Sequence, residues 1–356
     1  MDESVDMNDI SCSTSAKFAN MSIVCAALVV CMHVGGKFAC GSVGWWFSEL
    51  TRGGISRVAV PYFFLASGFF LMGKFIDVEG RSVIPVWLAE VYKRVRTLLI
   101  PFLIWPLIVM LWSAFFTLLA NHLARRPLGH AIPFMNGVYW PGVGHLWFIK
   151  FLFVLVLVSP AILFLVRRLG RIWLVITFVA YWGIYTFIDP VNATGSMGWC
   201  IYKVSLEGVA YFSAGIYLRQ FVAKDALLSR RVSVWMLMVG VLGVVGSMIY
   251  NSMQFSFGCG GLNLRHFPLP FLMAGMFGLM PRKRFPILLI SAAFPVYLMH
   301  VMWVVPVACL LNHVPWICAT MAYLLKWIIA FAVSVAAAWG LRRLMPCTAA
   351  ILFGGR

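Results

Sequence analysis

The sequence is dominated by long apolar runs that short clusters of basic residues separate. The runs are about 17–25 residues long, the length that an α-helix needs to cross a hydrocarbon core of roughly 30 Å. They fall at about 18–36, 57–73, 97–119, 145–166, 172–188, 200–218, 232–250, 264–280, 287–311 and 318–341. Backbone groups that face lipid must be hydrogen-bonded within the segment, and the runs lack the alternation of barrel strands, so they predict helices.

The composition agrees with a single bundle in a membrane. Hydrophobic residues make up 62% of the chain and charged residues 11%, whereas soluble domains carry about 25% charged residues. The predicted fold class is all-α, a polytopic integral membrane bundle of about ten transmembrane helices. We expect a flexible polar tail over residues 1–16, the transmembrane domain over 17–343 and a short cytoplasmic tail over 344–356. The acidic start argues against a removable signal peptide.

Basic residues alternate between the loops. They crowd the segments 74–96, 167–171, 219–231, 281–286 and 342–356, whereas 189–199, 251–263 and 312–317 contain no Lys or Arg. By the positive-inside rule, both termini are expected on the cytoplasmic side of the inner membrane. The same clusters account for the net charge of +17, so we expect no nucleic-acid partner.

The nine cysteines are scattered and form no Cys-x-x-Cys motif. Their spacing predicts neither a metal site nor a disulfide framework.

Several ionisable residues fall at membrane depth. His33, Arg57, His145, Lys150, Lys203, Glu207 and Lys326 lie in the predicted outer half, and His300 lies near mid-span. Facing lipid costs a charged side chain about 2.5–3.5 kcal/mol, so such residues tend to face an interior cavity.

Each of these residues also has a simpler explanation. Arg57, Lys150 and Lys203 are long enough to reach the outer headgroups. His33 and His300 each fit a hydrogen bond between packed helices, and Glu207 fits a pair with Lys203 one turn earlier. Taken together, however, so many polar groups at one depth favour a wet chamber that opens outward.

A basic segment at the inner face precedes the third run. In YKRVRTLLIPFLIW, residues 92–105, Lys93 and Arg96 would share a helical face at a spacing of three. Two cations on one face can hold phosphates. The alternative is that they only encode topology, as in the other cytoplasmic loops.

Five segments together resemble the membrane acyltransferase-3 family, in that family's order. They are VCAALVVCMHVGG, which ends just after His33, SRVAVPYFFLASGFFLM from residue 56, KRVRTLLIPFLIW from 93, HLWFIKFLF from 145 and FPVYLMHV from 294.

The resemblance implies an enzyme, an O-acyltransferase that moves an acyl group, expected to be acetyl, from cytoplasmic acyl-CoA to a hydroxyl of a cell-surface sugar or polysaccharide precursor. Carried over by position, His33 would be the catalytic base, and Lys93 and Arg96 would contact the phosphates of the donor. Arg57 would either contact the donor as well or belong to the lining of the site. The expected lining residues are Ser67, His145, Trp147, Lys150 and His300. No metal is expected. We add Glu207 as a candidate to orient an imidazole or to bind the sugar.

One position departs from the family pattern. The family usually has an Arg eleven residues before the histidine of the first helix, and this chain has Ser22 there. Lys17, the nearest cation in the sequence, lies more than one helical turn further away.

The mechanism that we expect follows from the distance between the predicted phosphate-binding cations and the predicted catalytic histidine. Lys93 and Arg96 mark the inner face and His33 the outer one, so an extended donor must bridge them, with its pantetheine arm threaded between helices. A membrane carrier for a small polar solute and a non-catalytic scaffold remain alternatives. The sequence predicts no oligomeric state.

Overall fold

The computed structural model describes residues 11–36, 38–76, 82–123, 145–188, 197–221, 228–257, 263–312 and 317–355. All regular elements in these ranges are helical. The first half contains α1 (Cys12–His33), α2 (Val43–Ser48), η1 (Glu49–Gly54), η2 (Ile55–Val58), α3 (Ala59–Phe75), α4 (Ile84–Arg94), η4 (Val95–Leu99), α5 (Ile100–Leu123), α7 (Trp147–Leu157) and α8 (Ser159–Leu169). The second half contains α9 (Arg171–Gly183), η6 (Ile184–Ile188), α10 (Met197–Phe221), α11 (Arg230–Phe257), α12 (Leu269–Leu279), α13 (Ile287–Asn312), α14 (Ala319–Leu344) and α15 (Pro346–Leu352).

The prediction of an all-helical membrane bundle is confirmed. Six helical stretches are long and apolar enough to cross a membrane, namely Cys12–His33, Val43–Phe75, Ile84–Phe116, Arg230–Met253, Ile287–Leu311 and Ala319–Leu344. The pair α7 and α8 would add a seventh, although it bends by 65°. Each of the ten predicted runs overlaps a helix, while the number of crossings and their sidedness stay predictions.

The bend between α7 and α8 has a local cause. Pro160 lies in the first turn of α8 and has no N–H to continue the helical ladder. The hydroxyl of Ser159 donates to the carbonyl of Val156 at 2.8 Å and so supplies a partner at the break. The chain therefore changes direction without an unsatisfied buried carbonyl at this point.

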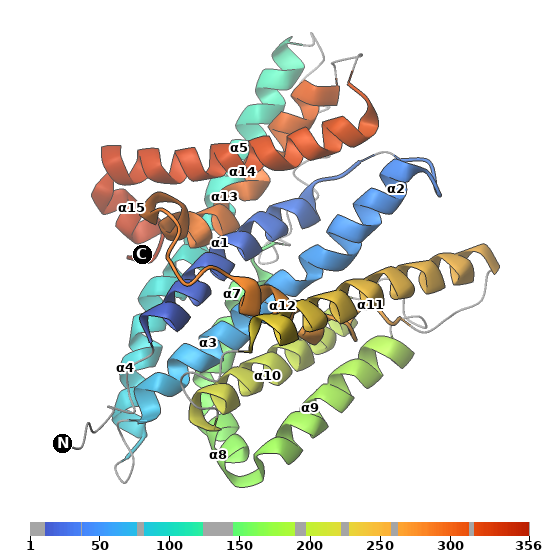
Figure 1. Ribbon diagram of the computed structural model, residues 1–356. Helices are drawn as coiled ribbons and strands as arrows, with labels where there is room; N and C mark the ends of the chain where they lie inside the picture. The colour runs from blue at the N-terminus through green and yellow to red at the C-terminus, as the bar shows by residue number, and fades with distance from the viewer. Residues whose placement is uncertain are drawn as a thin grey trace.

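Helix α1 runs through the middle of the bundle, between α3 and α13 (Figure 1). Most of its side chains are buried. Its Asn20 amide donates to the carbonyls of Pro281 and Lys283, at 3.1 and 2.9 Å, and accepts from the backbone N–H of Phe285 at 2.8 Å. This clasp fixes the α12–α13 connection against the first half of α1.

The close contact between α3 and α10 depends on two glycines. A Cβ atom on Gly68 would lie 2.1 Å from the carbonyl oxygen of Phe212, and one on Gly215 would lie 2.0 Å from that of Leu65. Both distances are far below van der Waals contact, so the two backbones touch because neither residue has a side chain. In a membrane the hydrophobic effect does not drive helices together, because lipid is as apolar as their side chains. Small residues promote helix association there by allowing close van der Waals packing of the backbones.

The N-terminal end of the predicted domain differs from the expectation. Helix α1 begins at Cys12, capped by Ser11, whose hydroxyl accepts from the N–H of Thr14 at 3.2 Å. Residues 12–16 are thus helical, because a side-chain cap satisfies the first turn. The expected tail over 1–16 is therefore wrong for these residues, and residues 1–10 lie outside the described ranges.

The expected tail over 344–356 is folded in the residues described there, and its cytoplasmic location stays a prediction. Residues Pro346–Leu352 form α15, and Phe353 behind it is fully buried. The indole N–H of Trp105 donates to the carbonyl of Leu352 at 2.9 Å. Burial of these two aromatic rings stabilises the segment against the start of α5, on the same side of the bundle as the start of α1 (Figure 1).

A Gly68→Ala variant tests the helix contact. The added methyl group meets the backbone of α10, so we expect a loss of stability of at least about 1–3 kcal/mol. Gly246→Ala in α11 is the matched control, because a Cβ there has nothing within 4 Å; this change should be neutral or stabilising by up to about 1 kcal/mol. Thermal unfolding of the purified protein in detergent measures both, and equal effects would contradict the packing role.

Candidate functional site

Three histidines from distant parts of the chain meet in one cluster. His33 ends α1, His145 precedes α7 and His300 lies within α13. The ring centroid of His300 is 4.8 Å from that of His33 and 5.3 Å from that of His145, and His33 and His145 are 6.5 Å apart. No set of three metal-ligating side chains in the described residues is arranged to hold an ion.

The three histidines differ in their surroundings. His145 and His300 are buried, and each hydrogen-bonds to backbone carbonyls: His145 Nε2 to Leu298 at 3.2 Å, and His300 Nδ1 to Tyr297 at 2.8 Å. His33 is exposed. The His300 Nδ1 contacts require a proton on that atom, which leaves Nε2 as the acceptor, and Nε2 has no hydrogen-bond partner among the described residues.

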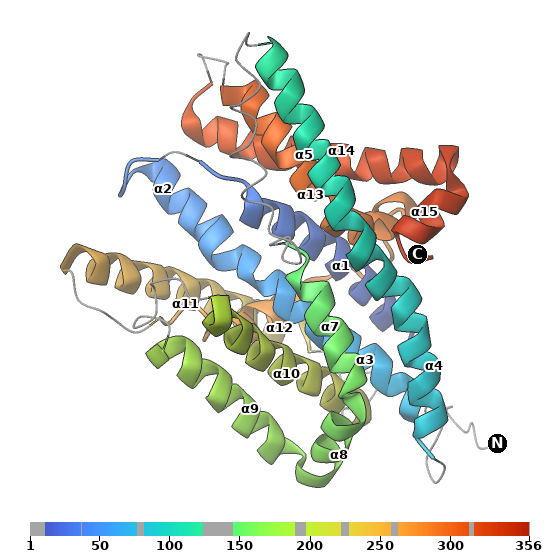
Figure 2. The ribbon, with the colours of Figure 1, turned by 180° about the vertical axis from the view of Figure 1, so that it is seen from behind.

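A cavity of about 560 Å³ lies beside this cluster. Its wall is formed by α1, α3, the α4–η4 junction, α7, α13 and the residues after α15. The polar lining consists of Ser22, Ser67, Lys93, Arg94, Thr97 and Ser291, and much of the rest is aromatic. The view from behind shows the long α4–α5 stretch and α7 along this side of the bundle (Figure 2).

Tyr297 joins the cavity to the histidines. Its ring lines the cavity, and its hydroxyl donates to the backbone carbonyl of His145. The same ring lies 6.3 Å from that of His300 and 5.7 Å from that of Phe148, a second lining residue. One layer of aromatic side chains therefore separates the cavity from the histidine cluster.

The cations at the other end of the cavity are Lys93 and Arg94. The predicted pair was Lys93 with Arg96, on one face of a regular α-helix, but Arg96 is exposed and is not part of the lining. The reason is the π-helix η4, which begins at Val95 and changes the helical rotation directly after Arg94. Arg96 therefore does not line the cavity together with Lys93, as the predicted pair required.

Arg94 was missed as a candidate. Its guanidinium lies 3.7 Å from the Glu90 carboxylate, and its Nε is buried without a hydrogen-bond partner in the described structure. Because a π-turn leaves no clear mark in the sequence, the only available signal was the membership of Arg94 in the same basic cluster.

Of three other predicted lining residues, one lines the cavity and two do not. Ser67 lies in the cavity wall. Trp147 packs its ring against those of Phe148 and Phe151, at 6.3 and 6.2 Å. Lys150 is exposed, beside a small apolar pocket against η4 and α5. Neither Trp147 nor Lys150 is part of the cavity lining.

Glu207 belongs to a second polar cluster. Its carboxylate accepts hydrogen bonds from Tyr181 at 3.2 Å and Tyr185 at 3.5 Å, and the Tyr181 hydroxyl also lies 2.8 Å from His266 Nδ1. The imidazole that Glu207 reaches through Tyr181 is therefore His266. The side chain of Lys203, its predicted partner, lies outside the described part of the structure.

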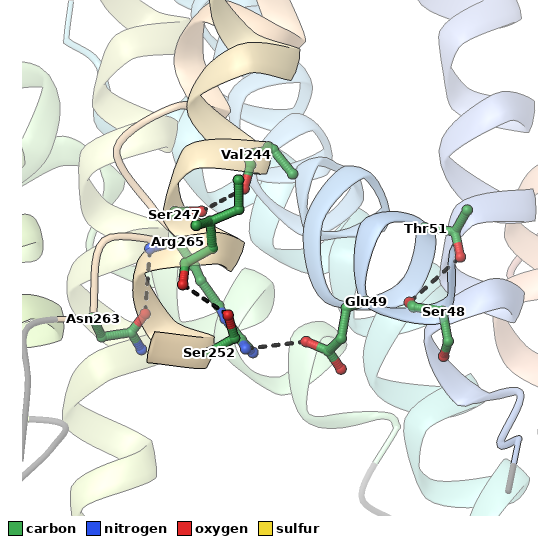
Figure 3. Close-up of polar contacts among 9 residues, drawn as sticks. Ser48, Glu49, Thr51, Val244, Ser247, Ser252, Asn263 and Arg265 are labelled. Atoms are coloured by element: carbon green, nitrogen blue, oxygen red, sulfur yellow. Dashed lines mark hydrogen bonds and ion pairs between the residues drawn. The ribbon is translucent and has the colours of Figure 1, made fainter. Parts of the chain in front are cut away.

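Arg57 lies with this second cluster. It is close enough to Glu207 and to Arg265 to act electrostatically on both. Arg265 in turn pairs with Glu49 at 3.0 Å (Figure 3). Arg57 was expected to contact the donor together with Lys93, but it is not part of the cavity lining to which Lys93 belongs.

Ser22 also faces the cavity. Its hydroxyl donates to the backbone carbonyl of Phe18 at 2.8 Å and lies 3.1 Å from the hydroxyl of Tyr62. The amine of Lys17 is turned to the carbonyl of Gly278 and is not part of the wall. The cations that line the same cavity as Ser22 are Lys93 and Arg94.

The fold and the site define a class: a helical membrane protein with a cavity that has cations at one end and, behind Tyr297 at the other, a cluster of imidazoles. The sequence profile of a family described as an acyltransferase domain matches residues 20–343. The chain belongs to this family, the membrane acyltransferase-3 family, and is a membrane acyltransferase. No curated protein and no solved structure matches the chain.

Tyr297→Phe tests the link between the cavity and the cluster. Loss of the hydroxyl leaves the buried carbonyl of His145 without this donor, so we expect a loss of stability of about 1–3 kcal/mol. Thermal unfolding in detergent measures it. Tyr92→Phe is the control, because Tyr92 is 67% exposed and its hydroxyl should contribute little. A Tyr297 variant as stable as this control would contradict the assigned hydrogen bond.

Proposed function

We propose that the chain is an O-acyltransferase that moves an acetyl group from cytoplasmic acetyl-CoA to a hydroxyl of a cell-surface sugar or polysaccharide precursor. The observation that carries the proposal is the cavity, which begins at Lys93 and Arg94 and ends at Tyr297, next to the three histidines. Family membership supplies the acyl transfer. Donor, acyl group and acceptor are inferred from the chemistry of the two ends.

The donor occupies the cavity in this proposal. Lys93 and Arg94 bind the phosphates of the nucleotide, because guanidinium and ammonium groups form charge-assisted hydrogen bonds with phosphate oxygens. The pantetheine arm passes the hydroxyls of Ser22 and Ser67, which can serve its amides. The thioester then lies against Phe148 and Tyr297, and these aromatic rings favour a short acyl group such as acetyl.

The acceptor approaches from the opposite side. His33 is the exposed member of the cluster, while His145 and His300 are buried behind it. The neutral His33 imidazole takes the proton from the acceptor hydroxyl as its oxygen attacks the thioester carbonyl. The C–S bond then breaks, the ester remains on the acceptor, and the coenzyme thiolate leaves and takes up the proton.

The sidedness of the scheme comes from the charge pattern of the loops. Lys93 and Arg94 lie in a basic segment, which the positive-inside rule assigns to the cytoplasm. Ten crossings, cytoplasmic termini and an inner-membrane location follow from the same pattern and are part of the proposal. The aromatic layer beside Tyr297 must open or rearrange for the thioester to meet the acceptor.

His33→Ala tests the base. General-base catalysis contributes about 10²–10⁴-fold, so we expect a loss of that size in transfer of labelled acetyl from acetyl-CoA to acceptor in membranes. His122→Ala is the control, because His122 is exposed at the end of α5. Retained transfer in a well-expressed His33 variant would remove the base from the scheme. Uptake of unmodified solute without label transfer would favour a carrier instead.

A comparison of Arg94→Gln with Arg96→Gln tests the donor site. Loss of a hydrogen bond to a charged group costs about 1.5–3 kcal/mol, so the KM for acetyl-CoA should rise about 10–100-fold in the Arg94 variant and stay near wild type in the Arg96 variant. The double variant Glu90→Gln with Arg94→Gln avoids an unpaired buried carboxylate. Equal effects at both arginines would contradict the assignment to Arg94.

A further inference from the structure

The end of the chain forms part of the cavity. Gly354 and Gly355 lie in the same wall as Lys93, Arg94 and Thr97. Both glycines fall beyond residue 343, where the match to the acyltransferase family ends. The family match therefore does not include these two glycines of the wall.

The segment is held firmly in place. Besides the hydrogen bond from Trp105 to Leu352, the buried ring of Phe353 stacks on that of Trp105, at 6.3 Å and 15°. The guanidinium of Arg342 lies over the ring of Phe353, 5.5 Å from its centroid. It also donates a hydrogen bond to the Ser291 hydroxyl at 2.9 Å. These contacts fix the two glycines that follow.

Gly354 touches the π-helix. It has φ +64°, and a Cβ atom there would lie 2.5 Å from the backbone oxygen of Thr97. Only glycine adopts this conformation at little cost and also allows so close an approach. Thr97 belongs to η4, the turn that determines which cations face the cavity. The contact therefore supports the placement of Lys93 and Arg94.

Gly355 borders open space. It has φ +72°, and a Cβ atom there would have nothing within 4 Å. Nearby, Arg94 Nε and the Thr97 hydroxyl are buried and have no hydrogen-bond partner among the described residues. Buried polar atoms are almost always paired in native proteins. Two such atoms in the wall of one cavity point to a ligand that carries acceptor oxygens.

We propose that the glycine pair after α15 completes the donor site: Gly354 seats η4 so that Arg94 and Thr97 face the cavity, and Gly355 keeps the space that the donor's phosphates occupy. This inference rests on the proposed function, in that the donor is acyl-CoA. Gly354 is a positioning residue, and Gly355 contributes room.

Gly355→Leu in the purified full chain tests the second role by kinetics. Because Gly355 is part of the cavity wall, we expect the added side chain to occupy donor space. The KM for acetyl-CoA should then rise at least tenfold, whereas kcat at saturating donor should stay within threefold and the KM for the acceptor should not change. Gly170→Leu is the matched control. Gly170 also has positive φ (+53°) and nothing within 4 Å of its Cβ position, and it lies between α8 and α9, outside the cavity wall.

An unchanged donor KM in the Gly355 variant, or an equal rise in the Gly170 variant, would overturn the proposal. Because a leucine at positive φ also strains the backbone, Gly355→Cys provides a second measurement. Alkylation of the introduced thiol by N-ethylmaleimide is followed by mass spectrometry with and without desulfo-coenzyme A, which has no thiol to consume the reagent. Exposed Cys347 in α15 is the internal reference.

We expect desulfo-coenzyme A to slow alkylation of the introduced thiol at least fivefold and to leave Cys347 unaffected. Equal rates with and without the analogue would overturn the inference. The two proposals fail differently. If desulfo-coenzyme A protects the introduced thiol from alkylation but the wild type transfers no acyl group, the proposed reaction is wrong and the nucleotide site is retained. Transfer with neither protection nor a KM change removes only the role of the glycines.

Discussion

The hydroxyl of Tyr297 donates to the backbone carbonyl of His145, and the ring that carries this hydroxyl also closes the cavity. Helix α13 thereby contributes to both ends of the site, because His300 follows one turn later and packs on His33. In a medium without water, a buried carbonyl at the break before α7 needs a protein donor. The same hydrogen bond that satisfies this carbonyl sets the position of the cavity relative to the imidazoles.

Close backbone contacts add to the packing of buried side chains around this site. Gly68 and Gly215 bring α3 onto α10, and Gly354 brings the end of the chain onto η4. Such contacts leave little freedom for sliding, because the backbone has no rotamers with which to adapt. Rigid walls of this kind suit a site in which phosphate-binding cations and a reactive imidazole must stay a fixed distance apart.

Two assemblies of polar groups lie near the site in the part of the chain that the structure describes. One contains the histidines and the cavity. The other contains Glu207, its two tyrosines and His266, with Arg57 nearby and the Glu49–Arg265 ion pair beside it. Hydrogen bonds and the ion pair satisfy many of these groups, as the cost of ionisable groups in lipid requires. His300 Nε2 in the first assembly and Arg57 Nε in the second have no hydrogen-bond partner among the described residues. The segment η1–η2 links them, since Arg52 acts electrostatically on His33 while Arg57 acts on Glu207.

The sequence by itself determined the helical membrane class, because length and apolarity of a run decide whether it can cross lipid without reference to other segments. It also supplied the family resemblance and most of the residues in question. It could not give their partners. Three features were decided by the tertiary structure. Arg94 rather than Arg96 lines the cavity, the expected C-terminal tail folds into a helix, and Arg57 and Glu207 belong to a second cluster. Each depends on contacts between residues far apart in the chain, such as Trp105 with Leu352, whose energies no local pattern encodes.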